Sequence, residues 1–101
     1  MSLNRVFSAN GNRLTIAVGE KFDFGKVQEF RSAYSSDSDD VTAVVIDLQR
    51  TQYMDSSALG MLLNMQKSMS DKVTSFSIIN CSEQVSKILS IARFDKKFTL
   101  S

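Results

Sequence analysis

The feature that most restricts the fold of this chain is the apolar run TAVVIDL at residues 42–48. Its valines and isoleucine are β-branched, and an unbroken run of this length is typical of a strand that is covered on both faces. Strands of that kind belong to parallel or mixed sheets, because helices cover the two faces. The run therefore predicts an α/β fold with a buried strand at its centre.

The first part of the chain, residues 3–18, predicts a β-hairpin. Asn10 and Gly11 can supply the positive φ angles that a tight turn needs. After them, apolar residues alternate with smaller or polar ones, as they do on one face of a strand: Leu14, Ile16 and Val18.

Helical spacing of apolar residues predicts helices over residues 24–34 and 58–69. A third helical stripe at residues 85–92 predicts a helix that starts near Ser82 or Glu83. Residues 75–80 predict a further strand, and KFTL at residues 97–100 predicts an edge strand. The order β-β-α-β-α-β-α predicts a mixed sheet of four to five strands, with an N-terminal hairpin and about three helices packed on it.

Composition excludes several functional classes. A net charge of +1, with no apolar stretch near the ~20 residues of a membrane span, gives no reason to expect nucleic acid or membrane as a partner. The chain has no histidine, which excludes Ser-His-Asp catalysis and His-containing zinc sites, and it has no glycine-rich phosphate loop. No metal or cofactor is therefore expected. The single Cys81 favours a reducing, cytoplasmic setting and is expected to be a small buried residue.

One segment has a biased composition, SSDSDD at residues 35–40. It is expected to be a solvated acidic loop. A phosphorylated or metal-binding loop is the less favoured alternative, because most exposed charge runs are simply solvated.

The segment YMDSSALG at residues 53–60 concentrates polar and small residues between a predicted strand and a predicted helix. In open sheets, functional sites gather at the carboxyl ends of the strands. Three loops are expected at that edge: GEKFDF, YMDSSALG and NCSEQ. The simplest interpretation is local, since Asp55 or Ser56 would make a good helix N-cap. That interpretation does not explain Gly60, because glycine inside a helix costs ~1 kcal/mol relative to alanine.

The second interpretation is a phosphorylation site on a docking surface. A serine at a helix N-terminus presents its hydroxyl among small side chains, and a phosphate would add roughly −1.5 to −2 charges next to Asp55. Met54 and Met61 flank the serines and are candidates for lining that surface, whereas Met65 and Met69 are expected in the core.

The segment VVIDLQRTQYMDSSALGMLLNMQKSM at residues 44–69 resembles the STAS domain, the fold of bacterial anti-sigma factor antagonists. In that family an apolar strand and a short polar link precede Met-Asp-Ser-Ser-x-Leu-Gly, which opens a helix. Element order and length extend the resemblance to a single domain over residues 1–101. The position after the two serines is often glycine in the family and is Ala58 here.

The resemblance implies a partner-switching regulator rather than an enzyme. Ser56 is the implied phosphate acceptor of a serine kinase of the anti-sigma type, and a PPM-type, metal-dependent serine phosphatase would remove the phosphate. The unphosphorylated form would bind the kinase. The implied partner-binding residues are Asp55, Ser57, Ala58, Gly60, Met54, Met61, Gly19, Glu20 and Asp23.

Two alternatives are weighed against this function. A hydrolase is disfavoured, because Ser56 has no histidine and Lys67 does not stand at Ser-x-x-Lys spacing. A non-switching STAS binding or scaffold module, with a nucleotide as one candidate ligand, stays open. The sequence also leaves open the oligomeric state and the pathway, with sigma-factor availability as the family's usual output and biofilm formation as another.

Overall fold

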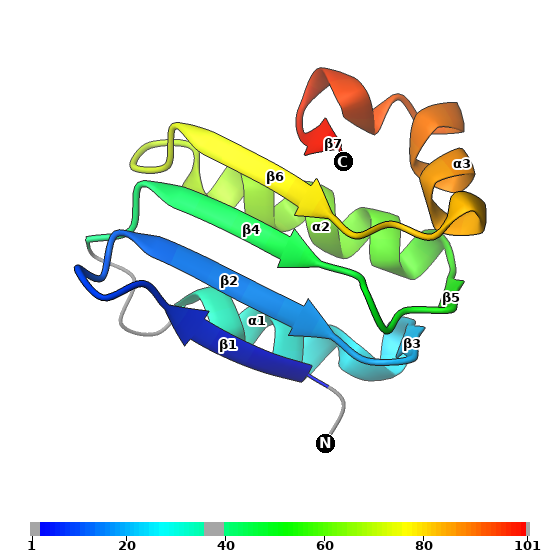
Figure 1. Ribbon diagram of the computed structural model, residues 1–101, viewed down its shortest axis with the longest axis horizontal. Coiled ribbons are helices and arrows are strands. Elements are labelled where there is room, and N and C mark those ends of the chain that lie inside the picture. The colour runs from blue at the N-terminus through cyan, green and yellow to red at the C-terminus, as the bar shows by residue number, and fades with distance from the viewer. Residues whose placement is uncertain (1–2, 36–39, 101) are drawn as a thin grey trace.

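A five-stranded sheet forms the centre of the molecule (Figure 1). The computed structural model describes residues 3–35 and 40–100. The strand order is β1-β2-β4-β6-β7, where β1 is antiparallel to β2 and the remaining neighbours are parallel. The strands are β1 (Leu3–Phe7), β2 (Arg13–Val18), β4 (Ala43–Asp47), β6 (Ser75–Ile79) and β7 (Thr99–Leu100). The predicted hairpin and the predicted edge strand at the C-terminal end are confirmed.

The hairpin connection differs from the predicted tight turn in one respect. Gly11 has a φ of 79°, whereas Asn10 is not among the residues with positive φ. The side chain of Asn10 instead accepts hydrogen bonds from the Ser8 hydroxyl, at 2.9 Å, and from the backbone N–H of Asn12, at 3.4 Å. The connection between β1 and β2 is longer than two residues, so a single left-handed residue is enough to reverse the chain.

Two helices lie together on one face of the sheet, α1 (Val27–Ser35) and α2 (Ser56–Met69), behind the strands in Figure 1. The third, α3 (Glu83–Ile91), lies beyond the carboxyl end of β6. Short 3-10 helices precede α1 and follow α3: η1 (Phe24–Lys26) and η2 (Phe94–Lys96). Within the described part of the chain, none of these helices has the length and apolar character to cross a membrane.

The prediction that residues 42–48 are covered on both faces was wrong. Along β4, Val44 and Ile46 are fully buried, whereas Ala43, Val45 and Asp47 are only half-buried. The cause is the placement of α1 and α2 on the same side of the sheet, which leaves the opposite face without a helical layer (Figure 1).

A second, two-stranded sheet was not predicted. It pairs β3 (Lys21–Phe22) with β5 (Tyr53–Met54) in parallel, with Lys21 opposite Tyr53 and Phe22 opposite Met54. The backbone N–H groups of Gln52 and Tyr53 both donate to the Glu20 carbonyl, at 2.8 and 3.1 Å. This pairing joins the segment after β2 to the segment before α2, which are more than thirty residues apart in the chain.

Thr51 anchors the junction between β3 and β5 to the end of β2. Its side chain is 2% exposed, and its hydroxyl lies 2.9 Å from the Gly19 carbonyl and 3.2 Å from the Val18 carbonyl, to which it donates. Thr51 is therefore a buried polar tie between the end of β2 and the link that leads to β5.

We expect Thr51→Val to lower the free energy of unfolding by about 1–2 kcal/mol, because it removes a buried donor while keeping the side-chain shape. Urea denaturation measures this loss. Amide hydrogen exchange should show faster exchange at Gln52 and Tyr53 in the variant. Thr99→Val, at an exposed position, is the matched control and should stay within about 0.5 kcal/mol of the wild type. Equal stability of the two variants would contradict the role assigned to Thr51.

Candidate functional site

The candidate site begins where β5 ends and α2 starts. Asp55 is the N-cap residue of α2, in an extended conformation, and its Oδ1 accepts a hydrogen bond from the Ala58 N–H at 3.2 Å. Ser56 is therefore the first residue of the helix, and it is exposed. The capping role accounts for Asp55. It does not account for Ser56, because the Asp55 carboxylate already accepts the N–H bond that a serine hydroxyl could have accepted.

The neighbours of Ser56 divide into exposed and buried groups. Ser57 and Met61 are half-buried, and Gly60 is exposed one helical turn after Ser56, on the same face of α2. Met54, Ala58 and Gly19 are buried. These three implied partner-binding residues thus lie below the surface of the protein.

The pairing of β3 with β5 brings the two predicted loops into one surface. Because Phe22 lies opposite Met54 in a parallel register, the residues that follow, Asp23 and Asp55, leave this pairing at the same end. Both are caps: Asp23 Oδ1 accepts from the Gly25 N–H at 3.0 Å, at the start of η1. Two carboxylate-capped helix starts therefore meet at the carboxyl edge of the sheet.

Two exposed aromatic residues beside these caps were missed by the sequence analysis. Phe24, the first residue of η1, is 74% exposed, and Tyr53, the first residue of β5, is 51% exposed. Aromatic side chains are enriched at the energetic centres of interfaces, so these two rings are candidates for contact with a partner. Tyr53 lies outside every apolar run, and that position is a signal that could have identified it. Phe24 was treated only as the start of the predicted helix at residues 24–34 and as the end of the GEKFDF loop.

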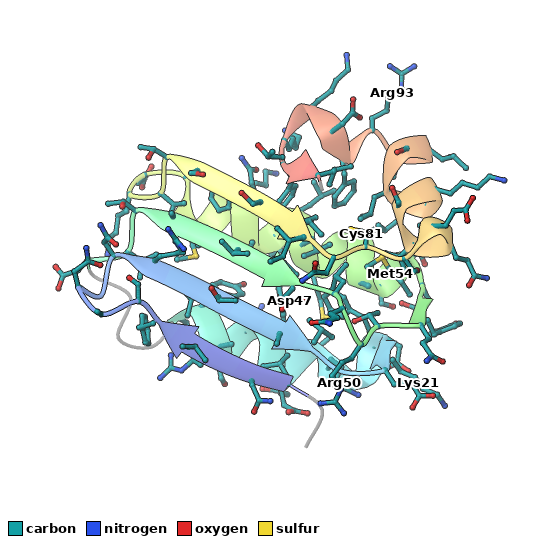
Figure 2. All side chains as sticks on the ribbon, in the orientation of Figure 1. Lys21, Asp47, Arg50, Met54, Cys81 and Arg93 are labelled. Atoms are coloured by element: carbon teal, nitrogen blue, oxygen red, sulfur yellow. The ribbon has the colours of Figure 1, made fainter. Side chains whose placement is uncertain are left out.

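Basic residues border the same surface. Lys21 lies opposite Tyr53 in the register, and Figure 2 shows Lys21 and Arg50 at the corner where β3 lies. The surface therefore combines exposed aromatic rings with charges of both signs, with the carboxylates closest to the helix starts.

The third predicted loop, NCSEQ at residues 80–84, directly follows β6 at the carboxyl edge of the sheet. Asn80 adopts a left-handed conformation with a φ of 58°, and its Nδ2 donates to Asp47 Oδ1 at 3.1 Å. Ser82 caps α3 by accepting from the Val85 N–H at 3.1 Å. Cys81 between them is half-buried rather than fully buried, and burial raises the pKa of its thiol. The loop is a structural support for the edge.

Across residues 3–35 and 40–100, no group of three or more histidine, cysteine, aspartate or glutamate side chains is placed to hold a metal ion. Most of the acidic SSDSDD segment, residues 36–39, lies outside the described residues, so the expectation of a solvated loop there is not tested.

The arrangement defines a class: a small α/β protein whose carboxyl edge presents an exposed serine at a capped helix start. The family model of the STAS domain matches residues 5–101, so the chain belongs to the STAS-domain family. Over 101 residues, the full length of both chains, it is 41% identical to a STAS-domain containing protein of Pseudomonas aeruginosa (strain UCBPP-PA14).

Solved structures of anti-sigma factor antagonists share the fold. SpoIIAA in its unphosphorylated form has a TM-score of 0.80 at 18% identity, over 99% of this chain and 88% of that chain. Its phosphorylated form, described as a Bacillus cell fate determinant, has a TM-score of 0.71 at 17% identity, over 99% and 91%. An antagonist from Mycobacterium paratuberculosis has a TM-score of 0.76 at 18% identity, over 98% and 85%. The predicted family and the mixed, five-stranded α/β fold are confirmed.

We expect Cys81 to react slowly with iodoacetamide at neutral pH. Burial raises its pKa, so the folded protein holds the thiol proton to a higher pH than the unfolded chain does, and less thiolate is present. The rate of alkylation against pH, measured with and without urea, should show a higher midpoint for the folded protein. Equal midpoints would contradict the assigned environment.

We expect Gly60→Ala to raise the free energy of unfolding by about 0.5–1 kcal/mol, because alanine is the better helix former and an added Cβ would meet no atom within 4 Å. Gly25→Ala is the matched control, since its Cβ would lie 3.2 Å from Asp23 Oδ1, and it should bring no such gain. A stabilising result means that the fold itself does not need Gly60. A loss of stability would show a structural need for the glycine.

Proposed function

We propose that this protein is a phosphorylation-controlled partner-switching regulator of the anti-sigma factor antagonist type, with Ser56 as the phosphate acceptor. The observation that carries the proposal is the exposed Ser56 at the first position of α2, where Asp55 does the capping. The partner is a serine kinase of the anti-sigma type. It binds the unphosphorylated protein, and a PPM-type, metal-dependent serine phosphatase restores binding after phosphorylation.

The fold accommodates a phosphate at Ser56. The first N–H groups of a helix lack intrahelical acceptors, and the helix dipole favours negative charge at this end. A phosphate would bring roughly −1.5 to −2 charges and three acceptor oxygens to that turn. The first turn of α2 would stabilise the group locally, so the switch needs no change of fold.

A phosphate on Ser56 would weaken binding of the partner. The docking surface that we propose consists of the exposed residues around the two caps: Ser56, Gly60, Tyr53, Phe24 and Glu20. Phe24 and Tyr53 supply apolar anchors, which bind well only when their surroundings are desolvated. A phosphate in the middle of this surface, next to Asp55 and Asp23, would add charge that the closed interface has to dehydrate. A loss of ~3 kcal/mol weakens binding by about two orders of magnitude.

Gly60 fits the same proposal. It lies one turn from Ser56 and exposes bare backbone, so a partner can approach the helix closely at this point. The protein then acts as a regulated ligand and kinase substrate, not as an enzyme, and its expected place of action is the cytoplasm. Sigma-factor availability, or a pathway such as biofilm formation, would be the output.

The test uses three variants of the full chain: Ser56→Ala, Ser56→Asp and, as the matched control, Ser57→Ala. Each is used to capture proteins from its own cells, and a captured kinase is then purified and titrated calorimetrically. Ser56→Ala should bind it like the wild type. So should Ser57→Ala, because Ser57 is half-buried and is not among the exposed residues of the proposed docking surface. Ser56→Asp should weaken binding by about tenfold or more, since it adds one charge at the proposed centre. Equal binding by all three proteins would exclude Ser56 as the switch.

Phosphorylation of the same variants by the purified kinase gives the second measurement. With ATP and magnesium, the wild type and Ser57→Ala should incorporate phosphate and then dissociate from the kinase. Ser56→Ala should incorporate none. Phosphate on Ser56→Ala would place the acceptor elsewhere.

A further inference from the structure

The face of the sheet opposite α1 and α2 carries no helical layer (Figure 1). In-register pairing runs one row of side chains straight across this face, from β1 to β7. The row consists of Val6, Thr15, Val45, Ser77 and Thr99. Every member is small or β-branched, and Val6 at its end is 63% exposed.

A bare face of this kind is unusual for parallel strands. Sheets made of parallel strands are normally covered on both sides, and the strands β2, β4, β6 and β7 are parallel. The row has no long side chains, so another sheet face could approach it closely. A sheet packed on a sheet is the common arrangement that such a surface fits.

The charges on this face identify the occupant. Within the described strands, only Arg13 and Asp47 place a charged side chain on it, and they stand at opposite ends of adjacent strands. Arg13 lies opposite Ala43 in the register, and Asp47 lies four residues further along β4, a separation of about 13 Å. A two-fold axis between two such faces, perpendicular to the line that joins Arg13 to Asp47, reverses one sheet relative to the other. It brings Arg13 of each copy over Asp47 of the second copy.

We propose that this face binds a second copy of the chain, in a symmetric dimer with the two sheets face to face and an Arg13–Asp47 pair at each end. Self-complementarity of this kind is what a two-fold interface requires, since the same patch serves both subunits.

The area of the face sets the strength of the dimer. Four strands of five or six residues and the two-residue β7, spaced about 4.8 Å apart, span somewhat less than roughly 400 Å². Two copies would bury less than about 800 Å², which is below the ~1,200 Å² at which stable interfaces begin. A face this small is therefore expected to give a weak, reversible dimer.

The dimer leaves the serine edge open. Ser56 begins α2, which lies on the opposite side of the sheet from the row of small side chains (Figure 1). Each copy thus keeps its own docking surface, and two linked sites would bind a dimeric partner more tightly than one site can. Dimer formation does not depend on phosphorylation, and its test is independent of the proposed function.

Sedimentation equilibrium on the full chain, from about 10 µM to about 1 mM, tests the proposal together with two variants that act on different parts of the face. Val45→Lys places a charge in the centre of the row and should raise the dissociation constant more than tenfold. Arg13→Glu places like charges at both ends and should raise it several-fold at low salt, with a smaller effect at high salt. The matched controls are Ile91→Lys and Lys87→Glu, exposed on α3, which should leave association unchanged.

Thermal unfolding confirms that each variant is folded. If Val45→Lys is not, concentration-dependent amide shifts of the wild type replace it, and they should concentrate at Thr15, Val45 and Ser77. A protein that stays monomeric up to about 1 mM overturns the proposal. A dimer whose dissociation constant is unchanged by Val45→Lys and Arg13→Glu also overturns the proposal. Amide shifts that lie on α1 and α2 instead of on the row overturn it too.

Discussion

The hydrogen bond from the Ala58 N–H to the Asp55 carboxylate fixes where α2 begins, and the candidate site depends on that starting point. An N-cap of this kind contributes about 1 kcal/mol, which is enough to hold a helix start in register. With Asp55 as the cap, Ala58 points into the core, at 0% exposed, and Ser56 is left at the exposed first position. A start one residue later would turn Ser56 into the cap and occupy its hydroxyl.

A second set of contacts joins the segment after β2 to the segment before α2, so that the two form one surface. The β3–β5 pairing holds the Asp23 turn beside the Asp55 turn, and Thr51 ties the link before β5 to the end of β2. Phe22 and Met54 point inward from this pairing and are buried, so that Lys21 and Tyr53 point outward. Because side chains alternate between the two faces along each strand, Phe22 is buried and Tyr53 is exposed to solvent.

The sequence predicted the features that local periodicity controls. The apolar run at residues 42–48, the helical spacing of Leu62, Met65 and Met69, and the Asp-Ser-Ser-x-Leu-Gly pattern located the sheet, the packed helix and the serine. It could not reveal what depends on distant pairing. The strands β3 and β5 are two residues each, too short for any pattern, and the burial of Thr51 follows from carbonyls more than thirty residues away. The bare face of β4 was mispredicted for a related reason, because an apolar run does not show on which side the helices pack.

Two surfaces with different chemistry therefore lie on one small sheet, one at its carboxyl edge and one on its bare face. The serine edge combines aromatic anchors with carboxylates and an acceptor hydroxyl, which suits reversible binding controlled by charge. The row from Val6 to Thr99 is uncharged and has no long side chains, which suits weak association with a like surface. Ser56 begins α2 at the carboxyl edge, whereas the row crosses the bare face near the middle of the strands, so a charge added at Ser56 lies off the row.

The most direct measurement of the central claim is phosphopeptide mass spectrometry on the protein recovered from its own cells under several growth conditions. The account predicts phosphate on Ser56, with an occupancy that changes with condition, and an unmodified Ser57. Persistent absence of phosphate from Ser56, alongside readily detected unmodified peptide, would contradict the switch and favour a constitutive binding module.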